Sequence, residues 1–153
     1  MKQMTEIWGM AAGHAYWEKT IQFAENCSWR AGPYLAKEMK RGAFQDWERV
    51  FCAVVDGEIA GFCTFTKKDE LPESYGFSPF IGFVFVAEAY RGNRLSGRMI
   101  EAVTDYARQI GFEKVYLMSG EKGLYEKYGF QSIGCYPTIF DTVDQLFERA
   151  VSK

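Results

Sequence analysis

The chain has 153 residues, of which 48% are hydrophobic and 17% aromatic, enough for one sizeable core, so we expect a single domain over residues 1–153. A formal net charge of −2 and a pI near 5.5 exclude the overall positive field typical of nucleic-acid-binding proteins. No segment is apolar for long enough to span a membrane, and no signal-like run follows the N-terminus, so we expect a cytoplasmic protein with neither nucleic acid nor membrane as a partner.

The cysteines and the single histidine exclude several kinds of site. Cys27, Cys52, Cys63 and Cys135 show no C-x-x-C spacing, and His14 is the only histidine. We expect all four thiols to be reduced, with Cys52 and Cys63 diagonal on one face of a hairpin and too far apart for a disulfide. A metal site or a histidine-based triad needs partners that this chain lacks, so we predict no bound metal.

Two helices are predicted near the N-terminus, over residues 13–27 and 33–42. Apolar residues of the first recur at three- and four-residue spacing. The second begins at Pro33 and ends at Gly42, residue types that favour the first turn and the end of a helix. Aromatic residues gather in this part of the chain, most of them expected in the core and one or two lining a pocket: Trp8, Trp17, Trp29, Tyr34, Phe44 and Trp47.

Two strands follow, over residues 48–55 and 58–67, and Asp56-Gly57 between them is a strong hairpin signal. The next segment is polar and reads as a loop. It is either a solvated turn or a rim that attracts a cationic substrate, and its acids are Asp69, Glu70 and Glu73.

The second half alternates strands and helices. A strand over residues 80–87 leads through a turn into an amphipathic helix over about 93–110, closed by Gly111. A strand over 113–119, a short helix over 120–128 and a strand over 130–136 follow. The tail over 141–152 carries features of both a helix and a strand.

The turn from Tyr90 to Arg98, YRGNRLSGR, suits an anion. The first N–H groups of a helix have no internal partner, and the helix dipole adds positive charge there. Three arginines surround it: Arg91, Arg94 and Arg98. On these residues alone, a phosphate site and a plain connection with solvated arginines are equally supported. The turn has neither the P-loop lysine nor the dinucleotide fingerprint, which disfavours nucleotide-phosphate hydrolysis.

The turn resembles the pyrophosphate loop of the GNAT family of N-acetyltransferases, whose pattern is Gln/Arg-x-x-Gly-x-Gly/Ala. Arg91 matches the first position, whereas Arg94 and Ser96 stand where glycines are usual. The segment Gly123–Phe130, GLYEKYGF, is similar to the Leu-Tyr-Glu-Lys-x-Gly-Phe segment near the end of the same domain. Both occur in the family order, and the resemblance covers about residues 48–136.

This resemblance implies an α/β fold with a mixed, twisted, mostly antiparallel sheet flanked by helices. The sheet splays between the fourth and fifth strands, here 80–87 and 113–119, and the tail becomes a strand. Acetyl-coenzyme A enters the split as a cosubstrate. Its pantetheine arm pairs with the backbone of Phe85 and Val86, and its pyrophosphate lies against Arg91, Gly92, Asn93, Arg94, Leu95 and Ser96. The asparagine that the family often carries before its second motif is replaced near Ser119 and Gly120.

Tyr125 is the predicted catalytic residue, because the resemblance places it beside the leaving sulfur. Its chemistry fits this role. A phenol has a pKa of about 10 and a thiol one of about 8.5, so a neutral tyrosine can donate a hydrogen bond to a departing thiolate. Without the resemblance, a core tyrosine would be the simpler interpretation. Tyr128 is the neighbouring candidate, at a position usually occupied by a packing residue.

The predicted function is acetyl transfer from acetyl-coenzyme A to a primary amine, on a small molecule or a peptide, by direct attack in a ternary complex. The alternative is a non-catalytic acyl-coenzyme A sensor or interaction module on the same fold. The general base is left open among Glu88, Glu70, Glu73 and a water chain. A homodimer is compatible with the sequence.

Overall fold

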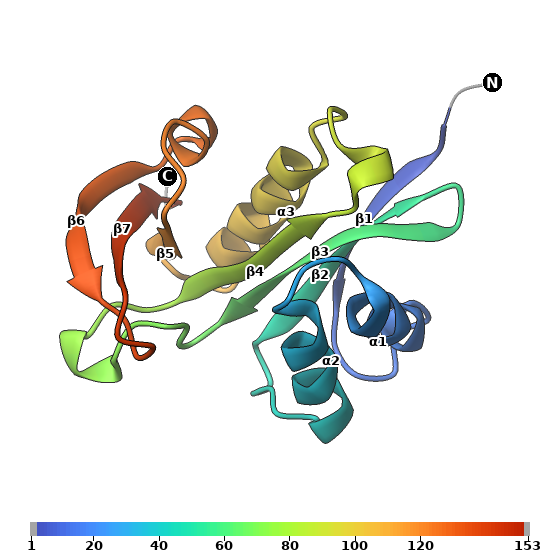
Figure 1. Cartoon of the computed structure of the whole chain (residues 1–153), viewed down its shortest axis with the longest axis horizontal. Helices are drawn as coiled ribbons and strands as arrows, with labels where there is room; N and C mark the ends of the chain where they lie inside the picture. Colours follow the sequence, from blue (N-terminus) through green and yellow to red (C-terminus); the bar gives the residue numbers. More distant parts are fainter. Residues whose placement is uncertain (1–2, 152–153) are drawn as a thin grey trace.

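The computed structural model describes residues 3–151, which form a seven-stranded sheet with helices on both faces (Figure 1). The helices are α1 (Trp17–Asn26), α2 (Gly32–Arg41) and α3 (Leu95–Gln109). The strands are β1 (Thr5–Met10), β2 (Arg49–Val55), β3 (Glu58–Thr66), β4 (Phe80–Val86), β5 (Lys114–Ser119), β6 (Gln131–Pro137) and β7 (Val143–Ala150). Their order is β1-β2-β3-β4-β5-β7-β6, and only β4 and β5 pair in parallel, which confirms the predicted mixed sheet.

Most predicted elements are confirmed, with two differences. The edge strand β1 was not predicted. The helix predicted over residues 120–128 is wrong: only Tyr125–Tyr128 form a 3₁₀ turn, because Gly123 has a φ of 82° and interrupts any helix before it. The tail is a strand over Val143–Ala150, as expected, and residue 152 lies outside the described residues.

The β2–β3 hairpin turns at Asp56-Gly57 with positive φ at both residues, as a tight two-residue turn requires. Its register then shifts: Ala53 faces Gly61 while Val54 faces Ile59, so β3 has one extra residue there. This bulge moves Cys63 to the opposite face from Cys52, and the prediction that the two share a face is therefore wrong. All four cysteines are free, and Cys52 and Cys63 are buried.

Two cores sandwich the sheet. On one face α3 packs its apolar stripe, including Met99, Ile100 and Val103, against the strands. On the other face α1 and α2 cover Phe62 and Phe85. Figure 1 shows α3 on one side of the central strands and α1 with α2 on the other. Each large apolar side chain buried in this way contributes about 1.5–3 kcal/mol to folding.

The sheet splits after the first residues of β4. Only Phe80 and Ile81 pair with β5, opposite Tyr116 and Leu117, whereas β5 and β7 pair over their whole length. Beyond this point β4 is held only by β3 and carries a bulge, with Phe83 at a φ of 49°. The predicted splay between the fourth and fifth strands is thus confirmed, and it leaves one edge of β4 free.

Candidate active site

The start of α3 offers unpaired N–H groups at the end of β4. The first intrahelical bond runs from the Arg98 N–H to the Arg94 carbonyl, and no side chain of the described residues caps the helix. The N–H groups of residues 95–97 are therefore available to an anion. Arg94 itself is left-handed, with a φ of 61°. This conformation, which costs a non-glycine residue about 1–2 kcal/mol, explains why glycine suits the position.

Arg91 lies folded back on β4. Its Nε donates to the Val86 carbonyl at 2.9 Å, and its guanidinium stands 5.7 Å from the centre of the Phe85 ring. The same side chain reaches Glu88 at 3.5 Å. A Cβ on Gly61 of β3 would stand 2.5 Å from the Phe85 carbonyl oxygen, so that carbonyl faces β3. Backbone groups alternate along a strand, so Val86, not Phe85, presents its carbonyl to the split.

Tyr128 contacts the start of α3, a contact that the sequence did not indicate. Its hydroxyl lies 3.0 Å from Ser96 Oγ. A Cβ on Gly97 would stand 2.7 Å from the Tyr128 ring, so glycine allows the ring to pack on the first turn of α3. The second motif therefore supports the first, because its 3₁₀ turn buttresses the helix start that holds the predicted pyrophosphate residues.

Tyr125 lies in the core on the α3 face, with 6% of its surface exposed. Burial raises the pKa of its phenol to about 12, with smaller contributions from Cys63, Glu121 and Tyr128. A hydrogen bond with Ser119 opposes the shift. Ser119 ends β5, at the border of the split. Tyr125 thus stays protonated throughout the physiological pH range and has a proton to donate there.

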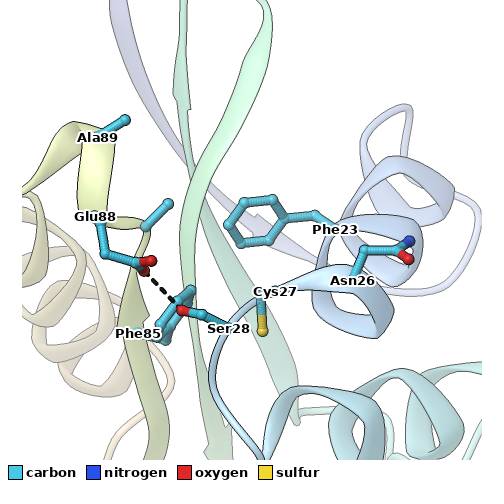
Figure 2. Close-up of a pocket in the computed structure, with 8 residues that line it drawn as sticks. Phe23, Asn26, Cys27, Ser28, Phe85, Glu88 and Ala89 are labelled. Carbon is cyan, nitrogen blue, oxygen red and sulfur yellow. Dashed lines mark hydrogen bonds between the residues drawn. The ribbon is translucent and has the colours of Figure 1, made fainter.

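A cavity of about 440 Å³ opens on the other face, between the end of α1 and the end of β4. Figure 2 shows Phe23 and Phe85 in its wall, with Ser28 donating to Glu88 Oε1 at 2.7 Å. This bond, and to a lesser extent Arg91, lowers the pKa of Glu88. Glu88 therefore suits the binding of a cation better than the uptake of a proton.

Trp29, in the connection between α1 and α2, extends an aromatic wall from this cavity along β4. Its ring stacks on Phe85 at 5.8 Å between ring centres and meets the edge of Phe83 at 6.0 Å. Trp29 is only partly buried. Trp17 is buried in the core, whereas Trp8 and Tyr34 are exposed away from this wall.

The acidic loop between β3 and β4 is exposed only in part. Glu73 does point outward and stands 3.8 Å from Lys68. Asp69, however, lies against Gly82 of β4, and burial raises its pKa from 3.8 to about 6, while the Glu70 N–H partly opposes the shift. Burial raises the pKa of Glu70 to about 7, and the negative charges of Asp69 and Asp144 add to this shift. The loop meets β4 near its beginning, at Gly82, whereas Glu88 follows the end of that strand.

Two kinds of feature are not found among residues 3–151. No helix there is long and apolar enough to cross a membrane. Nor does that part of the chain gather three or more His, Cys, Asp or Glu side chains in an arrangement that could hold a metal ion.

Comparison with known proteins identifies the fold. The sequence model of the Acetyltransferase (GNAT) family matches residues 14–130, more than half of the chain. The chain belongs to the GNAT acetyltransferase family. Comparison with curated protein sequences gives no significant match.

Solved GNAT structures superpose over nearly the whole chain. Aminoglycoside 6'-acetyltransferase type Ii is 15% identical with a TM-score of 0.72, over 95% of this chain and 97% of that one. An aminoglycoside 6'-N-acetyltransferase complexed with coenzyme A is 14% identical with a TM-score of 0.70, over the same shares. A GNAT acetyltransferase from Elizabethkingia anophelis with acetyl-CoA bound is 16% identical with a TM-score of 0.65, again over 95% and 97%. At these identities the likeness shows the shared fold.

The pKa of Asp69 gives this GNAT protein a testable pH dependence of stability. The folded value, about 6, lies above the ordinary 3.8, so the folded state binds the proton more tightly. Stability contributed by this group is therefore present below about pH 4 and is lost as the pH rises through 6. Asp69→Asn cannot ionise, so we expect it to melt higher than the parent at pH 8 and equally at pH 4. Equal melting temperatures at pH 8 would contradict the shift.

Proposed function

We propose that this acetyltransferase moves the acetyl group of acetyl-coenzyme A to a primary amine, which attacks the thioester directly in a ternary complex. One observation carries the proposal. The free edge of β4, opened where β5 departs after Ile81, leads straight to the uncapped start of α3 and its arginines. An extended arm that contains amide groups fits the free edge of β4, and a pyrophosphate fits the start of α3.

The cofactor would bind along β4 as an added strand. An amide N–H of the pantetheine arm would donate to the Val86 carbonyl. In the structure this carbonyl accepts from Arg91 Nε at 2.9 Å. Arg91, released from Val86, turns toward the pyrophosphate beside Gly92, Asn93, Arg94, Leu95 and Ser96. Asn93 Nδ2 donates to the Tyr90 carbonyl at 3.0 Å and so keeps the turn in shape. The choice of cofactor is supported by two solved structures of the same fold, one complexed with coenzyme A and one with acetyl-CoA bound.

Tyr125 would act on the leaving group. The phenol lies in the core on the α3 face of the sheet, next to Ser119 at the end of β5, and remains protonated because its pKa is about 12. As the C–S bond breaks, its hydroxyl donates a hydrogen bond to the sulfur and stabilises the developing thiolate.

The acceptor amine would arrive on the opposite face, where α1 and α2 leave the wall of Trp29, Phe83 and Phe85 partly open. This wall favours an acceptor with an apolar or aromatic body. Glu88, ionised and held by Ser28 in the cavity at the end of β4, would steer the positively charged acceptor toward this face of the sheet.

A thiol-release assay tests the function. Acetyl-coenzyme A is supplied with tyramine, spermidine, kanamycin or a lysine-containing peptide, and each product is identified by mass spectrometry. We expect thiol release and a mass increase of one acetyl group with at least one amine. Tight binding of acetyl-coenzyme A without release for any amine would favour the sensor function instead.

A further inference from the structure

Asp69 occupies a space that only glycine leaves open. A Cβ built on Gly82 would stand 2.7 Å from Asp69 Oδ1 and 3.2 Å from Thr64 Oγ1. Gly82 has no unusual φ that would call for glycine, and glycine in the interior of a strand weakens it. Close approach of the carboxylate therefore accounts for the glycine.

This space lies where the sheet splits. Ile81 is the last β4 residue that pairs with β5, and Gly82 is the next. The bulge follows at once, since Phe83 and Val84 together stand opposite the single residue Cys63. The carboxylate is thus placed at the closed end of the split, where the free edge of β4 begins.

The backbone on both sides of Asp69, at Lys67 and at Glu70, is anchored to other elements. The Lys67 N–H donates to Glu48 Oε2 at 2.7 Å, and Glu48 is itself buried. The Glu70 carbonyl accepts from the Ile139 N–H, also at 2.7 Å. Because the backbone is fixed on both sides, the Asp69 side chain is held in one position against β4. A proton acceptor needs such a fixed position.

Asp69 and Tyr125 lie on opposite faces of the sheet. Side chains alternate along a strand, so Gly82 shares a face with Phe80, which packs against Leu71 of the same loop as Asp69. Ile81 points the other way, into the core that holds Tyr125 and α3. A thioester carbonyl lying in the split would therefore have a carboxylate on one side and a phenol on the other.

We propose that Asp69 is the general base that takes the proton of the acceptor amine. The inference rests on the acetyl transfer proposed above and names a residue for its missing proton acceptor. The amine binds beside the Phe83 bulge, with its nitrogen at the Asp69 carboxylate and its body along the wall of Trp29.

The ammonium group of the acceptor gives one proton to Asp69, which later releases it to solvent. The neutral nitrogen attacks the carbonyl carbon and forms the C–N bond, the C–S bond breaks, and its electron pair leaves on the sulfur under the Tyr125 hydrogen bond. The nitrogen then loses its second proton, and the sulfur takes up one, giving the amide and free coenzyme A.

The other carboxyl groups fit this role less well. Glu88 is bound by Ser28 and Arg91 and has a lowered pKa. Glu70 shares a hydrogen bond with the carboxyl of Asp144 on β7, and Glu73 faces solvent. Asp69 has a pKa of about 6, close to neutral pH, where a general base works best. The titratable group beside Asp69 is Glu70, which in turn contacts Asp144. The groups of β3 and β4 against the Asp69 carboxylate, Thr64 and Gly82, are uncharged.

The pH profile of Asp69→Asn tests the inference. The probe is the amine of the panel that the parent acetylates fastest, and kcat/KM is measured from pH 5 to 10. In the parent we expect kcat/KM to fall below about pH 6. In Asp69→Asn we expect a loss of about 10²-fold or more at pH 7. This loss should narrow toward pH 10, because a neutral amine no longer needs a base. Calorimetric affinity for coenzyme A should stay at the parent value.

Two further variants sharpen the test. Gly82→Ala keeps the carboxylate but fills its space, so it should also lower kcat/KM. Glu73→Gln removes an outward-facing acid from the same loop and should have no effect. Parent-like kcat/KM in Asp69→Asn, or an equal loss at every pH, would overturn the role of Asp69 while acetyl transfer stands. A parent that acetylates no amine would remove both proposals.

Discussion

We expect Tyr125→Phe to lower kcat by about 10²–10⁴-fold, the usual contribution of a positioned acid, while the affinity for acetyl-coenzyme A stays close to that of the parent. The substitution removes one oxygen and keeps the ring among Phe130, Phe147 and Tyr128, so the packing of the core survives. The lost hydrogen bond with Ser119 should cost about 0.5–1.5 kcal/mol of stability. Steady-state kinetics, calorimetry and a thermal melt measure the three quantities.

Tyr128→Phe is the informative comparison, because the two hydroxyls have different neighbours. The Tyr128 hydroxyl meets Ser96 at the start of α3, so its removal should weaken binding of acetyl-coenzyme A and leave kcat nearly unchanged. Unchanged turnover in Tyr125→Phe would refute the catalytic assignment. A kcat defect in Tyr128→Phe alone would transfer the assignment to Tyr128.

The second large effect is expected at the turn. Replacing Arg91 and Arg94 together by glutamate should weaken binding of coenzyme A about a hundredfold or more. Each charged hydrogen bond is worth about 1.5–3 kcal/mol, and solvent exposure reduces that amount. Arg94→Glu keeps a Cβ at the positive φ, so it adds no new backbone strain. Calorimetry at low and high salt should show the loss shrinking as salt screens the charges.

The matched control is the pair Lys40→Glu and Arg41→Glu. Lys40 and Arg41 end α2 and pair with Glu25 and Glu38 at the surface. Their substitution changes the net charge by the same amount as the double substitution at the turn. Affinity should remain at the parent level in this control. If it falls as far as in the turn variant, the overall charge of the protein, and not the turn, governs binding.

Local patterns in the sequence were sufficient for most elements and for both motifs. The Asp56-Gly57 turn, the apolar stripe of α3 and the ends of α2 depend on residues a few positions apart, and such interactions form wherever the chain lies. The strand β1 was not predicted because it is a short edge strand whose residues are mostly half-exposed or exposed and whose apolar and polar residues alternate only weakly. The split between β4 and β5 came from the family resemblance, since no local pattern encodes it.

What only the tertiary structure decided concerns residues that are distant along the chain. One extra residue in β3 reversed the face of Cys63, because side chains alternate along a strand and a shift by one position exchanges the faces. Ser96 met Tyr128 only through the packing of α3 on the 3₁₀ turn. Asp69, which the sequence placed in a polar loop without a contact, lies over Gly82 because the flanking backbone is bound to Glu48 and Ile139. Contacts of this kind depend on how the strands pair and where they part, which no short stretch of sequence specifies.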